Sequence, residues 1–396
     1  MATSTRQQIR ANYLADEYEV INGLINEAAL SDELRTSITS RAANLVRTVR
    51  HESSPTLIEK FLAEYGLTTD ESVALMCLAE ALLRVPDSTT IQALIDDKLG
   101  PGDWSTHLGQ SKSSLINITT WGLMVAGKLI NPLEDMNLAE ILRGLTKRLG
   151  DPMVRTVAGQ AMAEMGRQFV LGRTIQEAFR RAERYEQQGY SYSYDMLGEA
   201  ARTDADALRY FRSYANAIEH LTPQCISEDI GENPGISVKL SALHPRFEAV
   251  HHGRVLTERV PRVMELAKQA KAANMGFNID AEEADRLDIS LDVIEALLAD
   301  SALEGWDGFG VVVQAYGKRA APVLDWLYDL TKRLNRKIMV RLVKGAYWDA
   351  EIKRAQVMGL ASFPVFTRKA CSDVSYITCA KKLLDMRDSI YPQFAT

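Results

Sequence analysis

Six polar side chains stand at or just after apolar segments of the C-terminal half of the chain, and their types suit the binding of an anion. They are Lys239, Asp280, Gln314, Arg341, Lys344 and Tyr347. Lysine and arginine hold carboxylates and phosphates by charge-assisted hydrogen bonds, and arginine adds two-point geometry. The aspartate would offset part of the positive charge and could hold a lysine or a substrate amine. The sequence therefore predicts a cavity for a carboxylate or a phosphate; the alternative is a set of salt bridges around a barrel mouth.

The segment IMVRLVKGAYWD, residues 338–349, is the most informative part of this set. It begins as an apolar strand and ends in charge, glycine and aromatic residues. Arg341 and Lys344 are costly within or beside a buried strand unless each meets an anion or a partner. Gly345 lets the backbone approach a ligand closely, while Tyr347 and Trp348 supply flat surfaces beside it. This pattern is typical of a strand that ends in an active site.

Other catalytic arrangements find little support in the sequence. The six histidines do not cluster at metal-ligand spacing, and no serine-histidine-acid set is apparent. His251 and His252 lie in a polar loop, where we expect a solvated pair. Glu282 and Glu283 are expected to open a helix, where acids favour the helix dipole. A metal-free, cationic pocket with aromatic side chains fits an organic cofactor better than hydrolytic machinery.

Short apolar strands alternate with amphipathic helices after about residue 189. Predicted strands cover residues 236–243, 277–281, 309–315, 338–343 and 390–395, with a weaker one at 364–367. Helical stripes over 287–298, 323–334 and 374–384 fill the gaps. Strand followed by helix, repeated, indicates a parallel sheet.

The polar residues at the strand ends favour a (β/α)8 TIM-type barrel, because such barrels build their sites at the carboxyl ends of the strands. A doubly wound sheet is the alternative, but its nucleotide site needs a glycine-rich first turn. Gly305, Gly308 and Gly310 precede a strand instead of following one, so we interpret them as loop glycines.

The N-terminal half is predicted to be helical and shows no chemistry. Apolar residues at helical spacing run through residues 14–28 and 34–49, and prolines separate further segments. We expect a helical arm over residues 1–49, a helical domain over 50–170 and the barrel over 171–396. The apolar stripe of the arm is expected to cover the protein's own core.

Charge and cysteine usage limit the partners and the compartment. The net charge of −6 and pI near 5.7 disfavour broad contact with nucleic acid. The four cysteines show no paired spacing, so neither a disulfide framework nor a zinc site is expected. Residues 1–10 are polar and lack the apolar core of a secretion signal. A reducing, cytoplasmic location is expected.

Six ordered segments of the chain resemble the proline dehydrogenase domain of the bifunctional proline utilization A family. They are SVKLSALHPRFE (237–248), GFNIDAEEADRLDISLDVIEAL (276–297), VVVQAYGKR (311–319), RLVKGAYWDAEIKRAQ (341–356), FTRKACSDVSYITCAKKLL (366–384) and IYPQFAT (390–396). The resemblance covers residues 191–396, and the region before it resembles the family's arm and helical domain.

The resemblance implies an FAD-dependent barrel that oxidises L-proline to 1-pyrroline-5-carboxylate, the first step of proline catabolism to glutamate. Electrons would pass to a quinone at the membrane surface, so the protein would lie in the cytoplasm with peripheral attachment to the inner membrane. Further copies of the chain are implied as partners in a homo-oligomer. Neither a metal nor nucleic acid is expected, because the basic strand and helix of the family's DNA-binding members are not found.

Motif matching to this family assigns roles by position. Lys239 would bind the proline carboxylate, Asp280 would orient the site and tune the flavin, and Tyr347 would pack at the substrate. FAD contacts are implied for Gln314, Arg341, Val343, Lys344 and Gly345, with Arg341 near the flavin N5, and for Thr367, Arg368 and Lys369 along the phosphate and adenosine end. Asp195 and Glu199 would support the substrate site, Glu199 by pairing with a substrate-binding arginine.

The match to the family stops at Thr396. The family's last two strands and last helix, which carry two arginines and a tyrosine of the substrate site, cannot be assigned here, and neither can its aldehyde dehydrogenase domain. We therefore expect a truncated proline dehydrogenase with an incomplete barrel. The alternative is a catalytically silent fragment that acts only in assembly or interaction, and visible absorption by bound flavin would separate the two.

Overall fold

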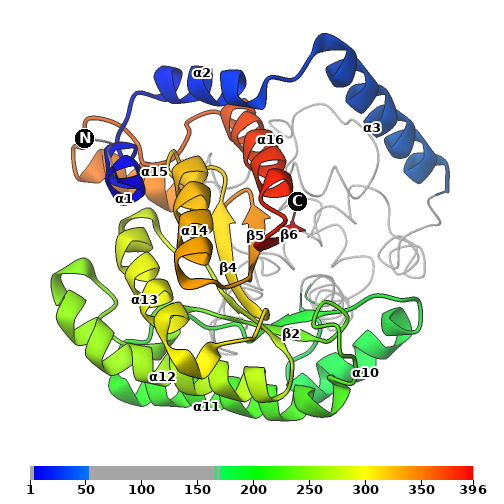
Figure 1. The fold of residues 1–396 in the computed structure, drawn as a ribbon, viewed down its shortest axis with the longest axis vertical. Helices are drawn as coiled ribbons and strands as arrows, with labels where there is room; N and C mark the ends of the chain where they lie inside the picture. The colour runs from blue at the N-terminus through cyan, green and yellow to red at the C-terminus, as the bar shows by residue number, and fades with distance from the viewer. Residues whose placement is uncertain (1–3, 53–165, 167–169, 396) are drawn as a thin grey trace, which may run out of the picture. The chain divides into compact units, whose positions relative to one another are not determined.

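The strands of this protein form one curled parallel sheet with helices around it (Figure 1). The computed structural model describes residues 4–52, 166 and 170–395. The chain divides into two compact units, one of residues 1–35 with 183–396 and one of residues 36–182. The first unit carries every strand of the described chain and is the one that matters for function.

Six strands follow one another in the sheet in the same order as in the sequence. They are β1 (Ser193–Asp195), β2 (Gly235–Val238), β3 (Gly276–Ile279), β4 (Phe309–Gln314), β5 (Ile338–Val343) and β6 (Ile390–Phe394). All neighbouring pairs are parallel. A doubly wound sheet would reverse its strand order at a switch point, and this sheet has none. The prediction of a (β/α) barrel is confirmed over the alternative.

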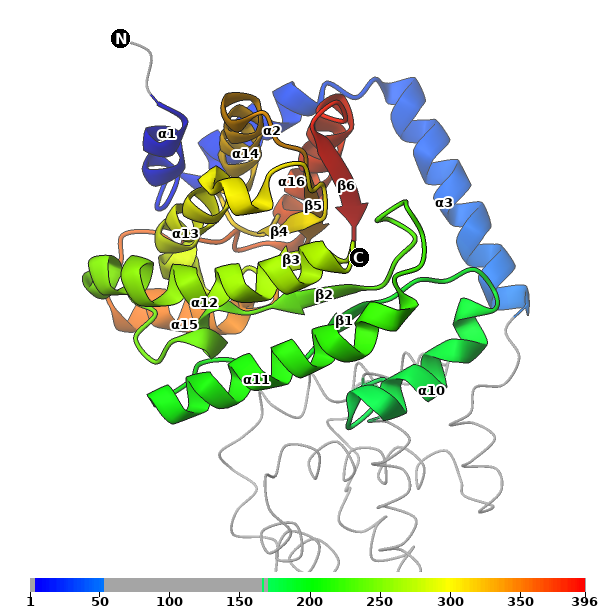
Figure 2. The ribbon, with the colours of Figure 1, turned by 60° about the horizontal axis from the view of Figure 1, so that its bottom comes forward.

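Helices cover the outside of the sheet, and Figure 2 shows α11 and α12 running beside β1 and β2. The helices of the unit that contains the sheet are α1 (Thr5–Ala11), α2 (Glu17–Ala28), α11 (Asp204–Leu221), α12 (His252–Ala272), α13 (Leu287–Ala299), α14 (Ala320–Leu334), α15 (Trp348–Val357) and α16 (Lys369–Asp385). Two further helices, α3 (Asp32–Glu52) and α10 (Ile175–Glu186), belong mostly to the other unit. Short 3-10 turns occur at Thr222–Gln224, Leu240–Leu243, Ala249–His251, Ala284–Arg286 and Ser301–Leu303. The connection from β5 to β6 thus contains two helices.

The middle strands are buried on both faces, as expected for a parallel sheet covered by helices. Ile236, Phe277 and Phe309 stand side by side on β2, β3 and β4 and are fully buried. The rings of Phe277 and Phe309 lie 6.4 Å apart. This apolar layer fixes the register of the strands, so the loops that follow them are held in one place.

The strands differ from the predictions in three places. The strand predicted over residues 236–243 ends at Val238, and Leu240–Leu243 form a 3-10 turn instead. Residues 364–367 were expected to form a weak strand, which is wrong: Val365 makes one isolated antiparallel bridge, to Gly317, and the segment lies outside the sheet. Conversely, β1 was not predicted. It has only three residues, of which Tyr194 alone is buried, so its alternation of polar and apolar residues is too short to distinguish a strand from a loop.

The first two helices pack onto the outside of the sheet unit. Helix α1 contacts α14, and α2 contacts α16, as both ribbon views show (Figures 1 and 2). Leu24 and Ala28 of α2 are buried, so the predicted stripe does cover the protein's own core. The helical domain predicted over residues 50–170 falls outside the described residues, apart from 50–52, 166 and 170. No helix in the described ranges combines the length and apolar character needed to span a membrane.

Candidate active site at the carboxyl ends of the strands

Lys239 is the centre of a charged cluster at the carboxyl ends of β1, β2 and β3. It directly follows β2, and its backbone N–H donates to the Tyr214 hydroxyl at 3.3 Å. Its Nζ lies 2.9 Å from Asp280 Oδ2 and 3.1 Å from Asp195 Oδ2. Asp280 follows β3 and Asp195 ends β1, so three adjacent strands place these groups together.

The cluster is shielded from solvent, since the side chains of Lys239 and Asp280 are each 15% exposed. Burial opposes the charge of Lys239, but the two carboxylates outweigh it and raise its pKa. Burial raises the pKa of Asp280 as well, and Lys239 only partly offsets this. The ammonium is therefore firmly charged, and Asp280 takes up a proton more readily than an exposed aspartate.

Arg341 lies across the same mouth from β5. Its guanidinium donates to Ser193 Oγ at 2.8 Å, Ser237 Oγ at 2.9 Å and Gln393 Oε1 at 3.3 Å. Because three strands separate β5 from β1, the contact with Ser193 requires the sheet to curl until its interior closes around the arginine. This contact is the direct sign of barrel curvature.

The charge of Arg341 has no direct counter-ion among the residues that the structure describes. Its hydrogen-bond partners are two hydroxyls and an amide, all neutral. Burial lowers the pKa of Arg341, and the more distant Asp280 and Asp195 oppose this only in part. A desolvated cation with neutral partners is a strong binding site for an anionic group.

A series of hydrogen bonds links the loops that follow the strands. Ser241 N donates to Glu282 Oε1 at 2.9 Å, which joins the β2 and β3 loops. Gln314 Nε2 donates to the Glu282 carbonyl at 2.9 Å, and Gln314 Oε1 accepts from Ala346 N at 3.1 Å. Ser241 Oγ accepts from Ala200 N at 2.9 Å. Five consecutive strand-end loops are thus tied to one another.

Glu282 lies at the centre of this series of hydrogen bonds, and its environment differs from the predicted one. It was expected to open a helix, and it does lie just before the 3-10 turn Ala284–Arg286; its side chain, however, is 2% exposed and pairs with Arg286 Nη1 at 2.7 Å. Burial raises the pKa of Glu282, while the hydrogen bonds from Ser241 and the charge of Arg286 lower it again. Its role is to join loops, which a pair of acids before a helix does not reveal.

Tyr347 spans the mouth from the β5 loop to the β1 loop. Its hydroxyl donates to Glu199 Oε2 at 3.0 Å. Burial and the nearby Glu199 raise the pKa of Tyr347, so its hydroxyl stays protonated as a donor. Gly345, two residues earlier, has φ +142°, and a Cβ there would lie 2.4 Å from the Tyr316 ring. Only glycine fits this turn, which sets the path of the loop.

The remaining predicted residues lie on the other side of β5. Lys344 Nζ lies 2.6 Å from Asp373 Oδ1, and Lys369 Nζ lies 2.7 Å from Asp373 Oδ2. Thr367 donates its N–H and hydroxyl to Glu17 of α2, at 3.1 and 2.9 Å. Arg368 is the residue before α16 and gives it no side-chain cap. Val343 is the last residue of β5 and pairs with Gln314 of β4.

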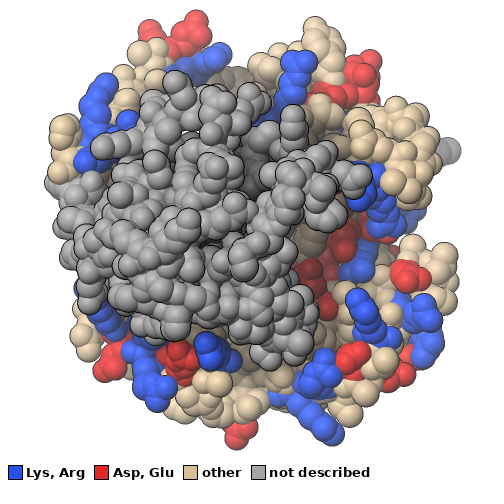
Figure 3. All heavy atoms as spheres, turned by 180° about the vertical axis from the view of Figure 1, so that it is seen from behind, with Lys and Arg blue, Asp and Glu red and all other residues tan. Residues whose placement is uncertain are grey.

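The predicted residues therefore form two groups instead of one strongly cationic cavity. Lys239, Asp280 and Asp195 are in contact, Arg341 shares the mouth with them, and Tyr347 meets Glu199. Lys239 and Lys344, the two lysines among the six residues predicted to form the cavity, are each paired with a carboxylate. On the face shown in Figure 3, Lys and Arg side chains are likewise interspersed with Asp and Glu side chains. Arg341 is the cation that keeps its charge available for a ligand.

Sequence reasoning missed the serines that hold Arg341 and the acids Glu17 and Asp373. Ser193 and Ser237 lie on strands, where serine carries no functional signal by itself. The only hint was that Ser237 belongs to SVKL, just before Lys239. Glu17 lies 350 residues from its partner, so spacing could not have identified it.

Three family models match the chain. The model described as "Proline dehydrogenase" covers residues 178–396. One described as "Proline utilization A proline dehydrogenase N-terminal domain" covers 3–50. A third, "DNA-binding domain of Proline dehydrogenase", covers 57–169, which lies outside the described residues. The absence of a nucleic-acid partner stays a prediction.

Individual relatives agree with the family models over almost the whole chain. The bifunctional protein PutA of Rhizobium meliloti is 50% identical over 394 residues, which are 100% of this chain and 32% of the relative. The protein of the same name in Salmonella typhimurium is 46% identical over 396 residues, 99% of this chain and 30% of the relative. The chain thus spans about a third of these relatives' length.

A solved structure agrees with these relatives. A crystal structure of proline utilization A from Bradyrhizobium japonicum shares 49% sequence identity with this chain, at a TM-score of 0.69. The match covers 97% of this chain and 38% of that chain.

Proposed function

Because the chain belongs to the proline dehydrogenase family, we propose that it carries out the FAD-dependent oxidation of L-proline to 1-pyrroline-5-carboxylate, with a quinone as electron acceptor. The observation that carries the proposal is Arg341, a half-buried cation whose described partners are all neutral. Such a group suits a site where negative charge develops during the reaction.

The residues at the mouth suit a flavin. When bound, FAD would supply the acceptor for the hydride that leaves the carbon beside the proline nitrogen. Arg341 would stabilise the negative charge that this transfer adds to the ring. Gln314 uses its oxygen and one N–H to tie two loops, so its second N–H is left to donate to the ring. Val343, Lys344 and Gly345 would line the ring's path along the end of β5.

Lys239 would orient the substrate. An ammonium has three N–H donors, and Asp195 and Asp280 take two of them. The third would bind the proline carboxylate, while Asp280 would lie near the proline nitrogen. Fixing the carboxylate at one side of the ring sets which carbon faces the acceptor, and such orientation supplies much of the rate.

Tyr347 and Glu199 would close the pocket over the substrate. The hydrogen bond between them joins the β5 and β1 loops, which holds the tyrosine ring at the mouth. Thr367, Arg368 and Lys369 would lie along the phosphate and adenosine end of FAD, where the two cations suit a pyrophosphate. We also propose a cytoplasmic location with peripheral attachment to the inner membrane, and a homo-oligomer.

One spectroscopic experiment tests the proposal. Purified protein should absorb in the visible range through bound flavin, and proline added without oxygen should bleach that absorption. A quinone analogue should then restore it. A protein that binds FAD but does not respond to proline would favour the alternative, in which the chain is catalytically silent and serves only in assembly or interaction.

A further inference from the structure

Glu17, the first residue of α2, is bound to the segment that precedes α16. Its carboxylate accepts from Thr367 N at 3.1 Å and from Thr367 Oγ1 at 2.9 Å. Both donors of Thr367 are therefore engaged by the N-terminal helices, although Thr367 itself is at the exposed surface. Hydrogen bonds to a carboxylate are among the stronger ones in proteins.

Helix α2 is fixed along the whole length of α16. Thr378 Oγ1 donates to the Leu24 carbonyl at 3.1 Å, and Lys381 Nζ donates to the Ala28 carbonyl at 2.8 Å. Lys382 pairs with Glu27 at 2.5 Å. Glu17 at one end and Ala28 at the other thus hold the two helices in register, so Glu17 reaches Thr367 from a rigid support.

A buried lysine ties the same region to the β4 loop. Lys318 is 2% exposed, and its Nζ donates to the Ala15 carbonyl at 2.8 Å and to Ser362 Oγ at 3.0 Å. Its neighbour Arg319 lies over the Tyr13 ring at 4.5 Å. The turn between α1 and α2 is therefore held by two cations that follow β4.

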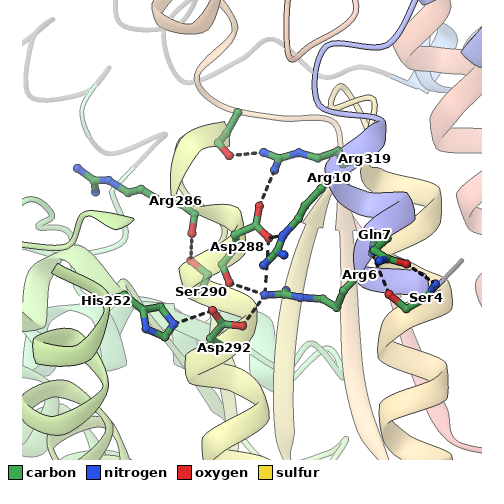
Figure 4. A network of polar contacts seen from close by, with 11 residues as sticks. Ser4, Arg6, Gln7, Arg10, His252, Arg286, Asp288, Ser290, Asp292 and Arg319 are labelled. Atoms are coloured by element: carbon green, nitrogen blue, oxygen red, sulfur yellow. Dashed lines mark hydrogen bonds and ion pairs between the residues drawn. The ribbon is translucent and has the colours of Figure 1, made fainter. Parts of the chain in front are cut away.

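Helix α1 is held by an ion network on α13 (Figure 4). Arg6 pairs with Asp292, and Arg10 Nε lies 3.0 Å from Asp288 Oδ1. Arg6 is mostly buried, with 17% of its side chain exposed, and its guanidinium lies 5.2 Å from the Trp326 ring. Helix α1 is therefore anchored independently of Glu17, and α2 is held by its contacts with Thr378, Lys381 and Lys382 as well as by Glu17.

We propose that α1 and α2 brace residues 364–369, the segment that carries Thr367, Arg368 and Lys369, and that Glu17 is the positioning residue of this brace. The inference rests on the proposed use of this segment for the phosphate and adenosine end of FAD. Because Thr367 is engaged by Glu17, the phosphates would be met by Arg368 and by Lys369, whose Nζ also pairs with Asp373 Oδ2 at 2.7 Å. The N-terminal helices thereby raise FAD affinity without touching FAD.

Cofactor affinity is the first test. Glu17→Gln keeps the size of the side chain but removes its charge, and we expect the Kd for FAD to rise about tenfold, as for the loss of a charge-assisted hydrogen bond. The Kd for FMN, which lacks the adenosine end, should change less than about twofold. Glu19→Gln, at an exposed position of the same helix, is the matched control and should change neither. Tighter FAD binding by Glu17→Gln would overturn the proposal, because Glu17 would then compete with the phosphates.

Hydrogen exchange in flavin-free protein tests the brace by itself. Glu17→Gln should speed exchange of the Thr367 amide, whereas the neighbouring Phe366 amide, which donates to the Tyr316 carbonyl at 2.8 Å, should be unaffected. Unchanged exchange at Thr367 would show that there is no brace. A protein that binds no FAD would contradict the proposed function, yet the exchange result would still decide the role of Glu17.

Discussion

Two cations face the same barrel mouth, and their surroundings are opposite. Lys239 lies between the carboxylates of Asp195 and Asp280. Arg341 lies between the hydroxyls of Ser193 and Ser237. A partly buried cation that is paired with carboxylates is fixed in place and contributes to the stability of the fold. A cation with only neutral hydrogen-bond partners keeps a net charge, so its interaction energy becomes more favourable when an anion binds. Lys239 is thus suited to position a substrate, whereas Arg341 is suited to stabilise negative charge on a ligand.

The largest expected effect is that of Arg341→Met on activity. Proline oxidation should fall about 100-fold or more, because a preorganised charge at a reacting centre contributes about 3 kcal/mol. Unfolding free energy should change little, since the variant leaves neutral groups behind and no lone charge. The measurement is proline-dependent reduction of a quinone analogue per bound flavin, with urea unfolding alongside.

Arg333→Met is the matched control for that experiment. Arg333 is half exposed, pairs with Glu295 at 2.8 Å and lies at the end of α14 that leads into the start of β5, whereas the site is at the carboxyl ends of the strands. It should keep full activity. If Arg341→Met also kept activity within about threefold, the proposed role of an unmatched charge would be wrong.

Lys239→Met, unlike Arg341→Met, should lower the free energy of unfolding. The change leaves Asp195 and Asp280 beside each other without a cation. We expect a loss of about 2 kcal/mol in the free energy of unfolding, less than the 3 to 5 kcal/mol of a fully buried pair because some solvent reaches the site. Urea unfolding measures this. Adding Asp280→Asn should recover more than half of the loss, and no recovery would argue against charge matching.

The stability contributions of Asp280 and Asp373, which each bind a lysine, should respond to pH with opposite sign. The pKa of Asp280 is raised, mainly by burial, so its contribution to stability falls as pH rises from about 4 through that pKa. The pKa of Asp373 is lowered by its hydrogen bonds to Lys344 and Lys369, so its contribution is present above about pH 4 and lost below. Unfolding free energies of Asp280→Asn and Asp373→Asn, each measured against the unchanged protein across pH 3 to 7, should therefore diverge in opposite directions. If the two variants changed the free energy of unfolding with pH in the same direction, the opposite pKa shifts of Asp280 and Asp373 would be contradicted.

The smallest expected effect is that of Ser237→Ala. Arg341 would keep Ser193 and Gln393, so activity should fall only about fivefold, in line with roughly 1 kcal/mol for one hydrogen bond. The same assay measures it, with Ser213→Ala on the exposed face of α11 as the control. A 100-fold loss would mean that Ser237 acts on the reaction directly.

The fold was predictable where burial is continuous. Strands β4 and β5 are long apolar runs, and their predicted limits agree with the structure to within one residue. Residues 364–367 look similar in composition but lie against the β4 loop, because the sheet is already filled on both sides of β5. A short apolar run does not reveal whether its partner is a strand or a loop.

The site was predictable by position but not by charge balance. Lys239 and Asp280 were identified because they follow strands, and the structure brings them to 2.9 Å. That Asp280 could hold a lysine was predicted, but the second carboxylate on Lys239, from Asp195, was not, since it depends on side-chain packing between strands that are 44 residues apart in the sequence. Glu282 was interpreted from its own local sequence, whereas its function comes from Ser241, 41 residues away.

The N-terminal helices make contacts at great distance along the chain. Arg6 meets Asp292 across 286 residues, and Glu17 meets Thr367 across 350. A ribosome adds roughly 5 to 20 residues per second, so Glu17 would wait about 20 to 70 s for its partner to be made. During that interval the helices that leave the ribosome first have no surface to dock on.

The same geometry therefore makes docking of α1 and α2 a late event of biosynthesis. These helices find their partners only after α13, α14 and α16 have been made in order. A chain interrupted before α16 would leave the apolar face of α2, with Leu24 and Ala28, open to solvent. Exposed apolar surface on incomplete chains is what chaperones and proteases act on, so the uncovered face of α2 would mark a chain in which α16 has not yet been made.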